Sequence, residues 1–489
     1  MELEISFLKT SIPYGSIIFD GQEFGRIDEI SKLSIKSNCD FTFSIDTRTT
    51  LKNQIFLAIP GENVDGHDFL QEALTSGAAA LIIEESKKKL LKKIDNKFLK
   101  NILIIIVPDT LKALIDLAKN WRKKFNYPVI GVTGSVGKTT TKEMLKSIFD
   151  SAGINSCVSL KNQNTLIGLC LNILRMKKTD QVAAFELGIS EKGEMEKKVE
   201  ILCPTIGVIT TVAHSHMATL GQLPEIAKEK KNIFKFFKQD YVGIVFGDSP
   251  LLGDSYYSHP VIRFGFKTKN HIQARRIKIC KDENGNLVAN FLLKIYKEKV
   301  KIRLKTHHRG NVQNSLAAAA VCNLIGVPVP EIVKGLNSFE GFEGRFEKRI
   351  LKKDLGLLIS DCYNASPESM RNALLAVDEI GVDGLKIAVL GDMLELGEKE
   401  DFWHRQVGRI LCKALSIKEV ILVGGLAKKI GETAPITAKI EYAKDWREAL
   451  KKLDEKLDRV GSQNISDSLV LVKASNGMKL DNLVKGVSL

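Results

Sequence analysis

The chain has 489 residues, of which 44% are hydrophobic and 27% are charged. This length is too great for one hydrophobic core and, at roughly 100 to 200 residues per domain, predicts about three domains. No apolar run approaches the roughly 20 residues that a membrane-spanning helix needs, which excludes a protein anchored by such a helix. The net charge of +14 arises from 72 basic and 58 acidic residues, and since no basic cluster is joined to a recognisable nucleic-acid module, it indicates a lysine-rich surface.

Residues 1 to about 120 predict a small α/β region. After an irregular start, apolar strands such as 55–59 and 102–107 alternate with helix-like segments. The triplet Asp46-Thr47-Arg48, predicted at a strand edge, offers a carboxylate, a hydroxyl and a guanidinium, which suit a diphosphate or a base edge. Taken alone, such a triplet is more often a surface turn.

The region from about 121 to 337 carries the strongest motif of the chain. An apolar strand beginning at Val129 leads into the stretch TGSVGKTT and then into a segment with one apolar helical face. The N–H groups of such a loop bind polyphosphate, Lys138 would reach the β- and γ-phosphates, and the Thr139 hydroxyl would ligate Mg²⁺. The alternative, a polar turn capping a helix, leaves a lysine at the positive end of a helix dipole unexplained. The nucleotide-binding residues predicted here are Thr133, Gly134, Ser135, Gly137, Lys138, Thr139 and Thr140.

Polar groups follow the phosphate loop at two further places. Asn162, Asn164 and Thr165 precede a predicted helix, and Glu186 ends an apolar strand. Because ligands bind at the carboxyl ends of parallel strands, Glu186 can reach a metal held by nucleotide phosphates. A strand-terminal glutamate in water is the simpler interpretation of Glu186 alone.

A histidine-containing segment then leads into a lysine-bearing helix. His214 and His216 alternate in an extended piece, so they are predicted to face opposite ways and not to chelate one ion. The helix predicted from Pro224 to Phe237 includes Lys230 among several lysines, most of which such a run leaves solvated. A strand-rich stretch follows to about 305, and Asn311 then begins a helical segment, where it would cap the helix or present its amide to a purine.

The last region, about 338 to 489, repeats an α/β rhythm. Its predicted strands are 356–360, 385–390, 419–423 and 468–472, each followed by a helix candidate. Polar loops follow three of these strands, with the sequences DCYNASPESM, GDMLELG and KASNGM. Ligand-like loops on one edge of a sheet are typical of a doubly wound fold.

Together these motifs resemble the Mur ligase family, and within it the branch that adds D-alanyl-D-alanine. SIDTRT and IFLAIPGENVDGHDF resemble the family's UDP-sugar module, TGSVGKTT its phosphate loop, and DCYNASPESM with VLGDMLELG the third domain of this branch. The resemblance covers about 43 to 486. It implies three α/β domains: a small UDP-sugar-binding domain (1–120), a central ATP-binding parallel-sheet domain (121–337) and a C-terminal Rossmann-like, doubly wound domain (338–489) that closes over ATP and binds the dipeptide.

The resemblance also implies roles for single residues. Glu186 and His216 would join Thr139 as ligands of two Mg²⁺ ions, and Lys230 lies at the family's spacing for a carbamylated lysine, in which CO₂ turns an ammonium into an anionic oxygen donor. His214 would be structural. The catalytic set implied is Lys138, Lys230, Glu186 and His216.

The adenine and ribose of ATP would be contacted by Asn311, Arg345 and Asp361. The substrate-binding residues implied are Asp46, Thr47, Arg48, Asn162, Asn164, Thr165, Tyr363 and Asn364. The family's histidine before Asn311 is here Gly310, with His308 as the nearest histidine.

The implied activity is ATP-dependent addition of D-alanyl-D-alanine to UDP-N-acetylmuramoyl-tripeptide through an acyl phosphate, for peptidoglycan synthesis. Three alternatives remain: the relative that adds the third peptide residue, a folate polyglutamylating enzyme, and a regulatory P-loop NTPase. The first lacks the GDM-x-ELG signature, and the second lacks the SIDTRT module. We expect a monomer with no nucleic-acid partner. The eight cysteines have no metal-type spacing and the start lacks a signal-peptide pattern, which together favour reduced thiols in the cytoplasm.

Overall fold

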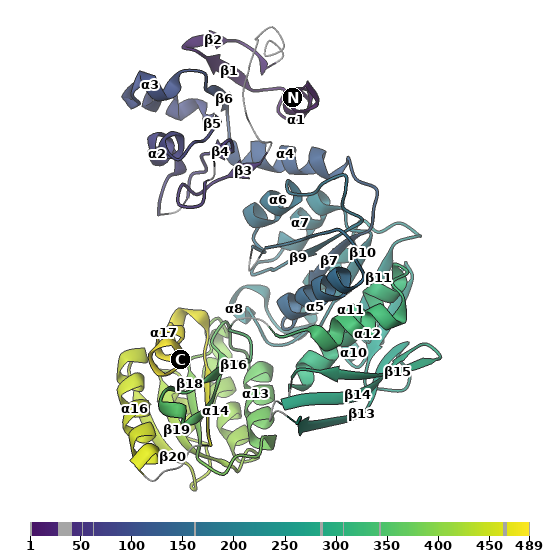
Figure 1. Ribbon diagram of the computed structural model, residues 1–489, viewed down its shortest axis with the longest axis vertical. Coiled ribbons are helices and arrows are strands. Elements are labelled where there is room, and N and C mark those ends of the chain that lie inside the picture. Colours follow the sequence, from purple (N-terminus) through teal and green to yellow (C-terminus); the bar gives the residue numbers. More distant parts are fainter. Residues whose placement is uncertain are drawn as a thin grey trace. The chain divides into compact units, whose positions relative to one another are not determined.

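The computed structural model describes residues 2–27, 42–50, 52–61, 63–160, 163–283, 287–306, 308–341, 344–462 and 467–488. The chain forms three β-sheets with flanking helices, whose elements are labelled in Figure 1. It divides into two compact units, the first made of Met1–Val129, Ser156–Leu187 and Lys197–Pro204, the second of Ile130–Asn155, Gly188–Glu196 and Thr205–Leu489. No helix within the described ranges is both long and apolar enough to cross a membrane. The seven cysteines in these ranges are free thiols.

The N-terminal sheet has six strands in the order β2-β1-β6-β5-β4-β3, of which β3 to β6 are parallel and β1 is antiparallel to both of its neighbours. The irregular start predicted from the sequence is wrong, because α1 and the β1–β2 hairpin precede the first predicted strand. Ile17 of β1 pairs with Ile105 and is fully buried, so tertiary packing orders a segment that has little periodicity of its own. The elements are α1 (Glu2–Ser11), β1 (Ser16–Phe19), β2 (Gln22–Phe24), β3 (Phe43–Ser44), β4 (Ile55–Leu57), η2 (Gly66–Phe69), α2 (Leu70–Thr75), β5 (Ala80–Glu84), η3 (Glu85–Lys93), α3 (Asn96–Leu99), β6 (Leu103–Val107) and α4 (Thr110–Arg122).

The central sheet has nine strands in the order β15-β14-β13-β12-β11-β10-β7-β9-β8. The pairs from β7 through β10 to β13 are parallel, as are β8 and β9, whereas β13, β14 and β15 are antiparallel. The predicted helix 224–237 ends earlier, at Lys231, where the 3₁₀ turn η4 takes over. The strands are β7 (Val129–Thr133), β8 (Ser156–Val158), β9 (Val182–Glu186), β10 (Ile206–Ile209), β11 (Val242–Phe246), β12 (Val261–Gly265), β13 (Ile272–Lys281), β14 (Leu287–Ile295) and β15 (Glu298–Leu304). The helices are α5 (Lys138–Ser151), α6 (Leu166–Ile173), α7 (Glu194–Leu202), α8 (Met217–Leu220), α9 (Leu223–Lys231), η4 (Asn232–Phe234), α10 (Pro250–Gly253), α11 (Arg309–Leu324) and α12 (Val329–Ser338).

The C-terminal sheet has the order β16-β17-β21-β18-β19-β20 and is parallel except for β16. The four predicted strands are confirmed, and the sequence missed the edge strands β16 and β20, whose residues are mostly polar and half-buried or exposed. Figure 1 shows α13 and α16 on opposite sides of this sheet, the doubly wound arrangement that was predicted. The elements are β16 (Glu347–Ile350), η5 (Lys352–Asp354), β17 (Gly356–Asp361), α13 (Pro367–Glu379), β18 (Lys386–Gly391), η6 (Gly397–Lys399), α14 (Glu400–Leu411), β19 (Ile417–Val423), α15 (Lys428–Gly431), β20 (Lys439–Ala443), α16 (Trp446–Ser462), β21 (Ser468–Lys473), η7 (Asn476–Met478) and α17 (Asp481–Val487).

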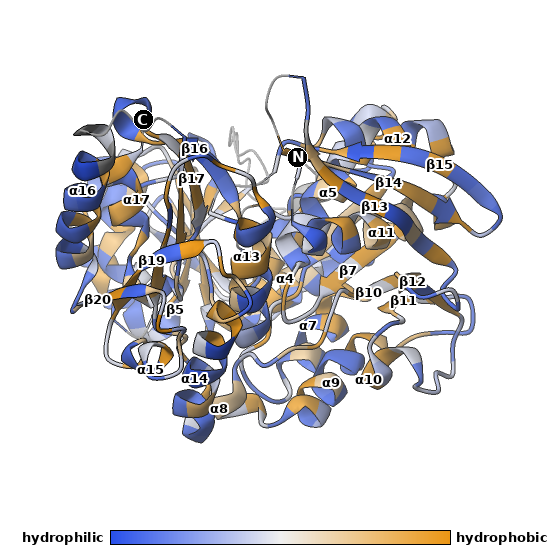
Figure 2. Cartoon of the chain, turned by 90° about the horizontal axis from the view of Figure 1, so that it is seen from below, coloured by the Kyte–Doolittle hydropathy of each residue, from blue (hydrophilic) through white to orange (hydrophobic). Residues whose placement is uncertain are grey.

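Apolar packing fixes the inner strands of this C-terminal sheet. Val389, Val470 and Leu453 of α16 are fully buried in one cluster, and each such side chain contributes about 1.5–3 kcal/mol on burial. In Figure 2 the outer sides of α14 and α16 are largely hydrophilic. The polar loops at the carboxyl ends of the strands therefore stand on a rigid support.

Candidate active site

The phosphate loop lies between β7 and α5, and the predicted strand–loop–helix geometry is confirmed. Gly134 and Gly137 have φ values of 150° and 90°, in the region that favours glycine. Lys138 is the first residue of α5, and its Nζ donates to the Gly134 carbonyl at 2.9 Å, so the side chain folds back over the loop. The Thr139 side chain next to it is fully buried.

A second layer of side chains, which the sequence reasoning missed, supports this loop. The Thr210 hydroxyl after β10 donates to the Val136 carbonyl at 2.6 Å, and the Gln313 amide of α11 donates to the Thr210 carbonyl at 2.9 Å. Asn314 lies so close that a Cβ at Gly137 would meet its Oδ1 at 2.2 Å. The only sequence signal for this layer was the polar run GNVQNS at the start of α11.

Gly137→Ala should raise the KM for ATP by about tenfold, because a left-handed alanine costs about 1–2 kcal/mol and its Cβ would also displace Asn314. The measurement is steady-state turnover with varied ATP, together with a thermal melt. Gly153→Ala is the matched control, since Gly153 follows the same helix with a φ of 68° and nothing within 4 Å of an added Cβ. An equal KM effect in both variants would assign the loss to strain alone.

Three basic side chains gather beside the phosphate loop in the second compact unit. Lys230 of α9 is only 2% exposed, and His216 caps α8 with a left-handed backbone. The pKa of His216 is lowered first by burial and then by the positive charges of Lys138 and Lys230, against the opposing effect of Glu395. Lys230 is the buried member of this group, whereas Lys138 and His216 are half-buried. The positive charges of Lys138 and Lys230 suit a phosphate ligand.

The segment around His216 contacts the C-terminal loops. His214 binds the Glu368 carboxylate through Nδ1, its ring lies 4.0 Å from that of Trp403, and its N–H donates to the same carboxylate at 3.2 Å. His216 pairs with Glu395, whose carbonyl also accepts from the Ala218 N–H at 3.3 Å. The two histidines pair with different carboxylates, and the left-handed backbone of His216 departs from the extended piece that the sequence predicted. Glu368 and Glu395 belong to DCYNASPESM and GDMLELG, so those motifs signalled contacts that sequence reasoning had not specified.

Glu186 lies in the first compact unit with its own polar neighbours. It ends β9, is 1% exposed, and accepts from the Asn164 amide at 3.0 Å. The buried Lys198, which sequence reasoning missed, donates from Nζ to the Asn164 carbonyl at 3.1 Å. Thr165 caps α6, where its hydroxyl accepts from the Gly168 N–H. Asn162 lies outside the residues that the structure describes.

The Asp46 triplet forms a closed turn in the N-terminal sheet. Arg48 donates to both carboxylate oxygens of Asp46, at 2.9 and 2.6 Å, and this hydrogen bonding lowers the pKa of the Asp46 carboxyl. The Thr47 hydroxyl donates to Glu72 at 2.9 Å. Because the Arg48 side chain is 84% exposed, a ligand can recruit its guanidinium.

A polar cluster also forms at the ends of β17 and β21. Asp361 ends β17, the Arg345 guanidinium stacks on the Tyr363 ring at 3.9 Å, and the Asn364 side chain accepts from the Ala365 N–H at 2.8 Å. The buried Nε of Arg345 has no hydrogen-bond partner among the described residues. An unsatisfied buried donor calls for a ligand or water. The Arg345 Nε can therefore donate to such a group.

The residues before α11 correct one prediction. His308, and not Asn311, occupies the cap position, and the Asn311 amide donates to the Thr306 hydroxyl at 2.9 Å. The helix begins two residues before Asn311, since Arg309 and Gly310 belong to its first turn. The His308 ring lies 4.9 Å from that of Phe346, and burial lowers the pKa of His308 to about 4, with Asp361 opposing the shift. A neutral histidine therefore lies beside the Asp361 cluster.

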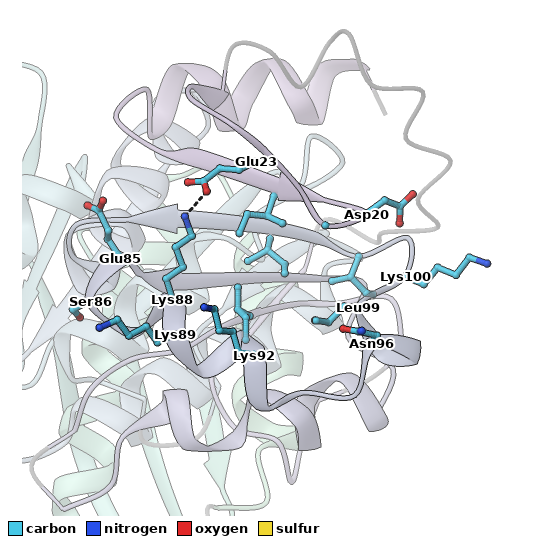
Figure 3. A pocket seen from close by; sticks show the side chains of 15 residues that line it. Asp20, Glu23, Glu85, Ser86, Lys88, Lys89, Lys92, Asn96, Leu99 and Lys100 are labelled. Atoms are coloured by element: carbon cyan, nitrogen blue, oxygen red, sulfur yellow. Dashed lines mark hydrogen bonds and ion pairs between the residues drawn. The ribbon is translucent and has the colours of Figure 1, made fainter.

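A cavity of about 1170 Å³ lies in the N-terminal part of the chain (Figure 3). Ile18, Leu91 and Ile104 contribute its apolar surface, and Figure 3 shows the Lys88–Glu23 ion pair on its border. None of the predicted site residues is among the described residues that line it. Four lysines and three carboxylates line the cavity, so its charge is nearly balanced and does not favour a ligand of either sign.

Comparison with known proteins gives consistent matches along the chain. Residues 42–122 match the model of the Mur ligase family catalytic domain, residues 132–322 the Mur ligase middle domain, and residues 344–476 the Mur ligase glutamate ligase domain. A UDP-N-acetylmuramoyl-tripeptide–D-alanyl-D-alanine ligase of Bacillus subtilis is 35% identical over 90% of this chain and 91% of its own length.

Two solved structures are similar over most of their length. A crystal structure of MurF from Acinetobacter baumannii has a TM-score of 0.81 at 27% identity and covers 98% of this chain and 97% of its own. MurF from Thermotoga maritima in complex with ADP has a TM-score of 0.74 at 27% identity, with 91% and 96% covered.

Proposed function

The chain belongs to the Mur ligase family, and from this membership we propose that it is an ATP-dependent ligase that joins D-alanyl-D-alanine to UDP-N-acetylmuramoyl-tripeptide. The observation that carries the proposal is the match, over about nine-tenths of both chains, to a ligase of that name. The products are ADP, phosphate and a UDP-N-acetylmuramoyl-pentapeptide for peptidoglycan synthesis. The enzyme acts in the cytoplasm as a monomer.

We infer the domain boundaries 1–120, 121–337 and 338–489. The family matches to 132–322 and 344–476 fall within the second and third ranges, the match to 42–122 ends two residues past the first, and each range contains one of the three sheets. The first domain binds the UDP-sugar through Asp46, Thr47 and Arg48, and the second binds ATP. The third contributes Tyr363 and Asn364 to the dipeptide site and closes over the nucleotide. The contacts of His214 and His216 with Glu368 and Glu395 support this closure.

The proposed chemistry activates a carboxylate that would otherwise have no leaving group. The terminal carboxylate of the tripeptide attacks the γ-phosphorus of ATP and displaces ADP. The amine of D-alanyl-D-alanine then attacks the resulting acyl phosphate and displaces phosphate. In the first step two anions must approach, so cationic side chains lower its barrier. We assign to Lys138, in the first turn of α5, the neutralisation of the β- and γ-phosphates.

The donor set suits Mg²⁺ bound jointly by protein and phosphates. The described residues contain no cluster of three or more His, Cys, Asp or Glu side chains of the kind that holds a metal alone. Mg²⁺ typically takes one or two protein carboxylates and completes its shell with phosphate and water. We propose Thr139, Glu186, His216 and carbamylated Lys230 as ligands at two sites. Bound Mg²⁺ would neutralise charge on the phosphates.

The nucleoside end of ATP is assigned to Asn311, Arg345 and Asp361. A carboxylate accepts hydrogen bonds from a ribose diol, which suits Asp361, and the unsatisfied Nε of Arg345 can donate to the nucleotide. The Asn311 amide has its Oδ1 available to a purine amino group, since its Nδ2 is the atom that binds Thr306.

Phosphate release from ATP tests the substrate and the reaction together. With UDP-N-acetylmuramoyl-tripeptide present, turnover should begin when D-alanyl-D-alanine is added, and the product should gain the mass of the dipeptide less water. Omission of the tripeptide is the control. Phosphate release that responds instead to DNA or RNA would contradict the proposal and favour a regulatory NTPase.

A further inference from the structure

Lys473 is a buried lysine to which the proposed reaction assigns no role. It ends β21, its side chain is 1% exposed, and the parallel register places it directly beside Asp361 of β17. Its Nζ donates to the Asp361 Oδ2 at 2.6 Å and to the Asn364 carbonyl at 3.0 Å. One ammonium group thus joins a strand-end carboxylate to the loop that follows it.

The two acceptors of Lys473 belong to different parts of the proposed site. Asp361 is assigned to the ribose of ATP, and its other oxygen accepts from the Phe346 N–H at 3.3 Å. Asn364 and Tyr363 are assigned to the dipeptide, and the Tyr363 N–H donates to the Gly344 carbonyl at 3.3 Å. Lys473 therefore connects the nucleotide side of the cluster with the dipeptide side.

Stability alone does not explain an ion pair at this depth. Removing an ammonium and a carboxylate from water is costly, and apolar replacements of buried pairs are often as stable or more so. What the pair provides is orientation, because charge-assisted hydrogen bonds are short and directional. A carboxylate held in this way presents its free lone pairs in a fixed direction.

We propose that Lys473 is a positioning residue that orients Asp361 toward ATP and the Tyr363–Asn364 loop toward D-alanyl-D-alanine. The inference rests on the proposed function, since it takes the two substrates from it. Lys473 itself contacts neither substrate in this scheme. It affects the binding of both substrates, because the Asp361 carboxylate and the Asn364 carbonyl change orientation when the Lys473 ammonium is removed.

The test compares Lys473→Met with Lys456→Met in the full-length enzyme. Lys456 of α16 is also buried in the C-terminal domain, where it pairs with Glu419 and Glu441, away from these loops. Lys473→Met should raise the KM for ATP and the KM for D-alanyl-D-alanine by about tenfold each, as expected for the loss of a charged hydrogen bond, and leave the KM for the UDP-tripeptide unchanged. Lys456→Met should lower thermal stability and leave all three KM values at the wild-type level.

Two results would overturn the role of Lys473. One is an unchanged KM for both ATP and the dipeptide, and the other is the same KM change in both variants, which would assign the effect to domain stability. If Lys473→Met does not fold, Lys473→Gln takes its place, because glutamine keeps polarity but cannot reach both acceptors with a charged donor; the same two criteria apply. A wild-type enzyme that does not ligate would contradict the proposed function, whereas a ligating enzyme with unaltered KM values contradicts only this inference.

Discussion

Lys138→Ala is expected to reduce ATP-dependent ligation by at least about a thousandfold, since in the proposed scheme it removes a cation that neutralises the transferred phosphoryl group. No other described lysine occupies the first turn of α5. Binding of UDP-N-acetylmuramoyl-tripeptide, measured by calorimetry without ATP, should be unchanged. Turnover is followed by phosphate release at saturating dipeptide.

The control for Lys138→Ala is Lys146→Ala, two turns further along α5. Lys146 is exposed and pairs with Asp150, so its loss should cost little. If Lys138→Ala retained more than a tenth of wild-type turnover at saturating ATP, the proposed place of Lys138 in the chemistry would be wrong.

Lys230→Ala should lower turnover by about a hundredfold or more, by analogy with the loss of one group that stabilises transition-state charge. The lost group in this scheme is anionic, because a carbamate supplies oxygen to Mg²⁺ where an ammonium could not. Acetate or formate added to Lys230→Ala should therefore restore part of the activity. Native mass spectrometry of the wild-type protein should show the mass of one bound CO₂, which the variant lacks.

Lys228→Ala is the matched control on the same helix. Lys228 is exposed whereas Lys230 is buried, so Lys228→Ala should keep full activity and gain nothing from acetate. Absence of the CO₂ mass from the wild-type protein, together with no response of Lys230→Ala to either acid, would exclude the carbamate and leave Lys230 a structural residue.

The parts of the fold that the sequence predicted are those set by local pattern. The apolar run at Val129, the glycines of the loop and the apolar face of α5 each define their own conformation, and the same holds for Glu186 at the end of β9. The α1 helix and the β1–β2 hairpin escaped prediction because their order depends on packing against β6 and α4. The edge strands β16 and β20 escaped it because they are too polar to show an apolar run.

The candidate site was predictable only in part, for a related reason. Spacing alone could not assign Lys230 among the lysines of α9, and the family resemblance selected it. Thr210, Asn314 and Lys473 were missed because each acts through a contact with a residue far away in the sequence, Lys473 with Asp361 being an example. The Asn311 cap was wrong because the first turn of α11 begins at Arg309, without a capping side chain.

The contacts by which Thr210, Gln313 and Asn314 hold the phosphate loop affect the free energy of nucleotide binding. A loop already held in shape loses little conformational entropy when ATP arrives, so more of the interaction energy is expressed as affinity. A rigid phosphate loop cannot by itself distinguish ATP from ADP through a change of conformation. In the proposed scheme, the groups around the γ-phosphate then distinguish ATP from ADP, and the C-terminal loops that contact His214 and His216 set the rate of product release.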